Sequence, residues 1–79
     1  MEPAVAFGKV LRKLRLEAGL TQEDLGLEAD LRRTYVSILE LGQQQPSLAT
    51  IFKLAKALDC SAMELIGMVE AEVVSRRRR

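Results

Sequence analysis

The sequence predicts an all-α fold, a compact domain of five helices. Leu and Ala are plentiful whereas aromatic residues make up only 4% of the chain, and no run of alternating β-branched residues indicates a strand. Apolar residues instead recur every three or four positions, which is the period of an amphipathic helix. The chain has 79 residues, enough for one domain. We place that domain at 1–75 and expect a basic, disordered tail at 76–79.

The first two helices are predicted from their ends. Pro3 suits the first turn of a helix, where its missing N–H is no loss, and Gly19 is expected to end this helix in a left-handed conformation. Thr21 can cap a second helix over 22–29, with Asp24 completing a weaker form of the capping box. The inner face of the first helix is expected to hold Phe7, Val10, Leu11, Leu14 and Ala18.

Three more helices follow. The third is predicted over 33–41 and ends before a polar loop at 43–46. Ser47 is expected to cap the fourth helix, whose apolar residues keep the helical period. A capping box at 61–64 opens the fifth helix, which is predicted to fade near Ser75.

The residue inventory argues against an enzyme. The chain has no histidine and a single cysteine, Cys60, so it lacks the commonest general base and the residues of a Cys/His zinc site. A lone cysteine fits a reducing cytoplasm, and no apolar run is long enough to cross a bilayer. We therefore expect a cytoplasmic, non-enzymatic protein with no metal, cofactor, small-molecule ligand or membrane partner.

The charge balance does not by itself indicate a nucleic-acid partner. The four arginines of 76–79 are part of twelve basic residues, so eight basic residues face eleven acidic ones in 1–75, a net charge of −3. A DNA-binding domain usually carries a surplus of positive charge. Evidence for DNA binding must therefore come from a motif and from the placement of particular residues.

That motif spans 21–42, where two short helices are joined by a short turn, as in a helix-turn-helix. The region 7–66 also resembles the phage-repressor-like (Cro/CI, or XRE) helix-turn-helix family. The pieces that carry the resemblance are Leu20–Leu25, Tyr35–Ser37, Glu40 with Gly42, Pro46–Leu48 and Leu54–Leu58. It implies a lambda-repressor-like fold and a transcriptional regulator that binds double-stranded DNA as a homodimer on a pseudopalindromic operator. The run Arg33–Tyr35 followed by Ser37 resembles restriction–modification controller proteins, although antitoxins and minimal phage repressors share this scaffold.

The outward face of the third helix is expected to read the bases. It holds Arg33, Thr34, Ser37, Ile38 and Leu41. Arg33 is the best candidate because its guanidinium matches guanine O6 and N7, and Thr34 suits a base or a phosphate. Ile38 either packs on a thymine methyl group or is tolerated at the edge of the groove. Tyr35 lies on the flank, where it either reaches a phosphate or packs partly in the core.

Other residues are expected to contact the DNA backbone. The resemblance implies a phosphate contact for Gln22, for which helix capping is the alternative. Arg32 occupies the position at which the family usually has a Ser or Thr that caps the third helix. This helix is therefore expected to lack a side-chain cap and to place a cation near a DNA phosphate instead. Gln43 and Gln44, in a loop where Lys and Arg are frequent in the family, can bond phosphate but release no counterion.

Two structural expectations complete the prediction. Glu40 follows a buried position, where a carboxylate needs a partner, and the resemblance implies that Arg15 supplies it; otherwise both are surface charges. The second helix is predicted to cross the third at close range beside Gly26, so a small side chain is needed at this position.

The last helix carries more apolar surface than one small core can use. Leu65 and Ile66 are expected to close the core, and Met68, Val69 and Val73 to form a two-fold dimer contact. An alternative function is a protein-interaction module in which Leu27, Ile38 and Leu41 form a binding patch, or an antitoxin that uses the same helical fold.

Overall fold

Residues 1–75, which the computed structural model describes, form five helices and no strand. These are α1 (Pro3–Glu17), α2 (Gln22–Ala29), α3 (Arg33–Glu40), α4 (Leu48–Ala57) and α5 (Ala62–Ser75). The predicted all-α fold is confirmed, and the helix ends fall within about a residue of the predicted ones. The expected tail at 76–79 lies outside the described residues. None of the helices in 1–75 has the length and apolar character needed to span a membrane.

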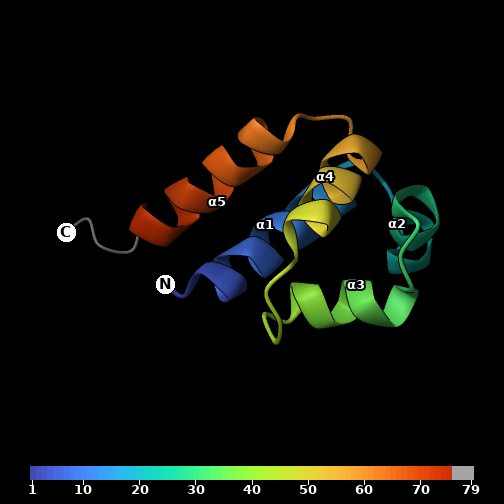
Figure 1. Ribbon diagram of the computed structural model, residues 1–79, viewed down its shortest axis with the longest axis horizontal. Helices are drawn as coiled ribbons and strands as arrows, with labels where there is room; N and C mark the ends of the chain where they lie inside the picture. The colour runs from blue at the N-terminus through green and yellow to red at the C-terminus, as the bar shows by residue number, and fades with distance from the viewer. Residues whose placement is uncertain (76–79) are drawn as a thin grey trace.

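The first helix is the centre of the arrangement. Figure 1 shows α5 lying along one side of α1 and α3 on the opposite side, and both helices contact α1. The short helix α2 packs against α3 and α4, and α4 in turn contacts α5. As a result α3 lies at the edge of the molecule, with its inner side on α1 and α2 and its outer side uncovered.

Helix ends are formed as the local sequence predicts. Gly19 has a positive φ of 75°. Thr21 Oγ1 accepts a hydrogen bond from the backbone N–H of Asp24 at 2.9 Å, and the backbone N–H of Thr21 donates to the Asp24 carboxylate at 3.1 Å. These bonds hold the pKa of Asp24 below its ordinary value. Ser47 caps α4, and a second reciprocal capping box opens α5 at Ser61.

The core draws on all five helices. It comprises Ala6, Phe7, Val10, Leu11, Leu25, Ala29, Val36, Leu39, Leu54, Ala55, Leu65 and Val69. Ala18, expected on the inner face of α1, is exposed because the helix ends one residue before it.

Two expectations for α5 are wrong. Ile66 was expected to close the core, but its exposed fraction is 42%. Val69 was expected to need a second copy, but it is only 8% exposed and belongs to the core of the single chain. Val73 also packs partly against this core. Helix α5 is therefore rotated so that Leu65 and Val69, rather than Leu65 and Ile66, face inward.

Close backbone approaches fix how α3 sits. A Cβ atom on Gly8 would lie 2.5 Å from the carbonyl oxygens of both Leu39 and Glu40, so only glycine lets α1 and α3 meet at this distance. A Cβ on Gly26 would lie 2.6 Å from the carbonyl oxygen of Leu31. The predicted need for a small residue at Gly26 is confirmed, but the close neighbour is the turn before α3 rather than α3 itself, and even alanine requires a shift of the backbone.

We predict that Gly8→Ala lowers the free energy of unfolding by about 1–3 kcal/mol, the usual cost of overpacking. The matched control is Gly67→Ala, because Gly67 is a helical glycine whose added Cβ would meet nothing within 4 Å. That control should gain about 0.5–1 kcal/mol from helix propensity. Urea unfolding of both variants checks the prediction, and equal effects would contradict it.

Candidate nucleic-acid interface

Helices α2 and α3 form the helix-turn-helix through a connection of three residues. Asp30 takes a left-handed conformation with φ 58°, and the backbone N–H of Leu31 donates to the carbonyl of Gly26 at 2.8 Å. Leu31 is partly buried against the core. The turn is therefore pinned at its middle, and this fixes the direction in which α3 leaves it.

The outer side of α3 brings together the residues predicted to read DNA. Arg33, Thr34 and Leu41 are exposed, whereas Ser37 and Ile38 are half-buried. The opposite side carries Val36 and Leu39, which are fully buried. We refer to Arg33, Thr34, Ser37, Ile38 and Leu41 as the reading face.

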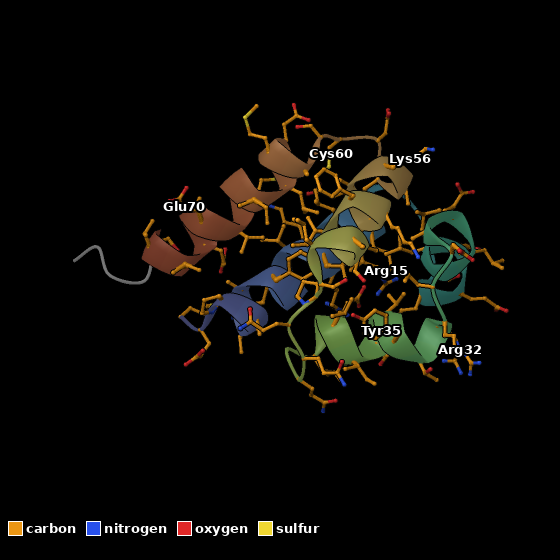
Figure 2. The ribbon with its side chains drawn as sticks, viewed as in Figure 1. Arg15, Arg32, Tyr35, Lys56, Cys60 and Glu70 are labelled. Atoms are coloured by element: carbon orange, nitrogen blue, oxygen red, sulfur yellow. The ribbon has the colours of Figure 1, made fainter. Side chains whose placement is uncertain are left out.

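The residues that flank α3 differ in their surroundings. Arg32 precedes the helix, provides no side-chain cap and is exposed, and Figure 2 shows it at the outer corner where α3 begins. The predicted loss of a cap at this position is confirmed. Tyr35 is half-buried and packs against the core, as the alternative for this residue expected. A phosphate contact by its hydroxyl stays a prediction.

A buried ion pair joins α1 to α3. Arg15 Nε donates to one carboxylate oxygen of Glu40 at 2.6 Å and a terminal nitrogen donates to the other at 3.1 Å. The side chains are only 9% and 3% exposed. The third Arg15 bond goes to the carbonyl of Leu20 at 2.9 Å. The predicted pair is confirmed, and the hydrogen bond to Glu40 raises the pKa of Arg15 above its ordinary value.

Gln22 is part of the same network, which the sequence did not predict. Its amide nitrogen donates to Glu40 at 3.1 Å, so the carboxylate joins the first turn of α2 to α1 and α3. Helix capping, the alternative considered for Gln22, is wrong because Thr21 provides the cap. One amide N–H remains for a phosphate, and that contact stays a prediction. No local pattern reveals the bond to Glu40, which lies 18 residues away.

A shallow hollow lies beside the start of the reading face. It lies between the end of α1, the start of α2 and the start of α3, and its lining includes Leu16, Gln22 and Arg33. Leu16 was not singled out by sequence analysis, because an exposed leucine near a helix end has no distinctive local pattern. The hollow brings the candidate phosphate contact and the candidate base contact to one depression of the surface.

The loop after α3 carries the remaining candidate contacts. Gly42 has a positive φ of 73°, and the backbone N–H of Gln43 donates to the carbonyl of Ile38 at 3.2 Å. The loop thus turns back over the end of α3, and the side chains of Gln43 and Gln44 are exposed. Within 1–75 no group of three or more acidic, cysteine or histidine side chains is arranged to hold a metal ion.

Comparison with known proteins agrees with this geometry. A family model described as helix-turn-helix matches residues 11–65. Control protein C.BamHI from Bacillus amyloliquefaciens is 41% identical over 76% of this chain and 75% of its own length. The structure of the restriction–modification controller C.AhdI from Aeromonas hydrophila is 48% identical, with a TM-score of 0.76 over 78% of this chain and 94% of that one.

A further structure shows a related protein on DNA. The restriction–modification controller C.Esp1396I, solved as a tetramer in complex with its natural 35 base-pair operator, is 30% identical to this chain. The TM-score is 0.84, over 94% of this chain and 97% of that one.

The ion pair yields a stability prediction. Glu40→Gln keeps the shape of the side chain but leaves the Arg15 cation buried without a counter-charge, which we expect to cost about 3–5 kcal/mol of unfolding free energy. Glu23→Gln, an exposed change of the same kind, is the control and should alter stability by less than about 0.5 kcal/mol. Similar urea midpoints for the two variants would show that the pair is not buried in solution.

Proposed function

The chain belongs to the phage-repressor-like helix-turn-helix family and is a DNA-binding transcriptional regulator, and we propose that it binds a pseudopalindromic operator in double-stranded DNA as a homodimer. The observation that carries the proposal is the uncovered reading face of α3, held in place by the buried Arg15–Glu40 pair. An exposed α-helix of this kind fits the major groove of B-DNA. The homology to controller proteins favours that class of regulator over an antitoxin or a phage repressor.

The proposed contacts divide into base reading and backbone positioning. Arg33, exposed in the first turn of α3, would read a guanine, and Thr34 beside it a base or a phosphate. Gln22 and Arg32 would hold the backbone near the start of α3, with the N-terminal amides of α2 adding favourable dipoles. Gln43 and Gln44 would hold it at the other end of the helix. Contacts at both ends of α3 would fix its register along the groove.

We propose that this work needs neither catalysis nor a cofactor and takes place in the cytoplasm, where the operator is. The family consists of DNA-binding regulators. The chain contains no histidine, and the thiol of Cys60 is made less reactive by partial burial and by nearby acidic residues, which raise its pKa.

The dimer contact is proposed on an exposed apolar surface of α4 and α5. Met63, Ile66 and Val74 recur on one side of α5 and are all exposed, as is Phe52 on α4. We refer to these four residues as the dimer patch. Met68, also predicted in the contact, is exposed as well and lines a groove between α1 and α5, and its part in a dimer stays a prediction. An exposed apolar surface of this kind marks an interaction site, and a two-fold copy covers it with the same residues.

We expect Arg33→Ala to cost about 1–3 kcal/mol per half-site and to relax the preference for one base pair. Gln43→Ala should weaken all sequences alike and leave the salt dependence nearly unchanged, because a neutral side chain displaces no counterion. The operator is first selected from a random DNA pool. Mobility shifts at two salt concentrations then compare the operator with every single-base variant. A uniform loss across variants for Arg33→Ala would reduce Arg33 to a phosphate contact.

The dimer is tested by Ile66→Asp, which places a charge in the dimer patch while leaving the core of the single chain intact. Burying an unpaired carboxylate at an interface is unfavourable, so we expect monomers in sedimentation at tens of micromolar and weak operator binding. Leu27→Asp is the control for sedimentation only, because Leu27 is 76% exposed on α2, outside the patch, but lines a hollow with Arg32, a proposed phosphate contact. A dimer that survives Ile66→Asp would place the contact elsewhere.

A further inference from the structure

The centre of the reading face is apolar, and its apolar side chains lie outside the core, although Ile38 is half-buried. Ile38 lies between Thr34 and Leu41 on the outer side of α3, one turn from each. Val36 and Leu39 are the residues that α3 buries, and Tyr35 packs partly against the core. Neither Ile38 nor Leu41 belongs to that core or packs against it, and Leu41 is 65% exposed.

The side chains around Ile38 on the outer side of α3 bring no charge to the middle of the reading face. Thr34 and Ser37 are uncharged, and Arg33 lies more than one turn away at the start of the helix. Glu40, the acidic residue of α3, is turned inward to Arg15 and Gln22. The middle of the reading face therefore offers apolar surface between two hydroxyl side chains and no charged one. An isoleucine in a helix holds that surface in one strongly preferred rotamer.

The major groove presents one apolar group that such a surface can recognise, the methyl group on C5 of a pyrimidine. Thymine carries it, and 5-methylcytosine places the same group at the same position. We propose that Ile38, with Leu41 beside it, recognises a C5 methyl group in each half-site, so that operator affinity depends on pyrimidine methylation. This inference rests on the proposed function, since it assumes that α3 enters the major groove.

The test removes methyl groups from the DNA. Each thymine of the selected operator is replaced in turn by deoxyuridine, which lacks only the C5 methyl. At one position per half-site we expect the wild-type protein to lose about fourfold in affinity, which corresponds to about 0.8 kcal/mol for one buried carbon group. Ile38→Ala should bind the thymine operator more weakly and be indifferent to deoxyuridine at that position.

Leu27→Ala is the control, because it removes an apolar side chain of α2 that is more exposed than Ile38 and lies outside the reading face. This variant should keep the wild-type response to deoxyuridine. Thermal melting of Ile38→Ala checks that the variant is folded. A C·G pair at the identified position separates the two sources of the methyl group. There, 5-methylcytosine should restore part of the wild-type affinity that unmethylated cytosine loses, and no recovery would confine recognition to thymine and overturn the proposed dependence on methylation.

Different results would contradict the methyl contact and the proposed function. If Ile38→Ala keeps the full preference for thymine over deoxyuridine at every position, the methyl contact is wrong while operator binding stands. If the wild-type protein selects no sequence from the random pool, the proposed function itself fails.

Discussion

The buried pair of Arg15 and Glu40 is the interaction on which the placement of α3 depends. Two charges removed from water are costly unless both are fully hydrogen-bonded, and here both carboxylate oxygens and three guanidinium nitrogens have partners. The partners come from α1, from the connection after it, from α2 and from α3. A rotation of α3 about its axis would disturb the bonds of Glu40 to both α1 and α2. Gly8 makes the arrangement possible, because a side chain there would hold α1 and α3 apart.

Because of this constraint, the inner side of α3 holds the helix in place and the outer side is free for the proposed contacts with DNA. A helix of eight residues without a side-chain cap is too short to be stable alone, so its stability comes from the inner side through Val36, Leu39 and Glu40. The outer side is thereby released from packing. Arg33, Thr34 and Ile38, the residues proposed to contact DNA, can then vary without disturbing the core, so the same scaffold could serve a different operator by changes in these side chains alone.

The sequence predicts local features well and relative rotations poorly. Caps at Thr21 and Ser47 involve neighbours within three residues, so their patterns are visible in the chain. The partnership of Arg15 with Glu40 spans 25 residues, and it was predicted only through resemblance to a family. The bond from Gln22 to Glu40 had no comparable signal. On α5, apolar residues occupy more than half of the positions, and their period alone did not decide whether Ile66 or Val69 faces the core. That depends on the packing of several helices together.

The charge balance bears on how such a domain obtains its affinity. With a net charge of −3 over 1–75, the domain has a weaker long-range attraction to DNA than a basic domain has, and few of its proposed phosphate contacts would release counterions. The loop after α3 offers glutamines where a more basic protein would offer cations, so the phosphate contacts proposed for this loop would be neutral hydrogen bonds. Affinity must then come from shape, from direct contacts to base edges and from the pairing of two half-sites in a dimer. Base contacts differ between sequences whereas phosphate contacts do not. A domain that relies on base contacts loses most of its binding on a wrong sequence. Weak electrostatic attraction to DNA therefore increases the difference in affinity between the operator and other sequences.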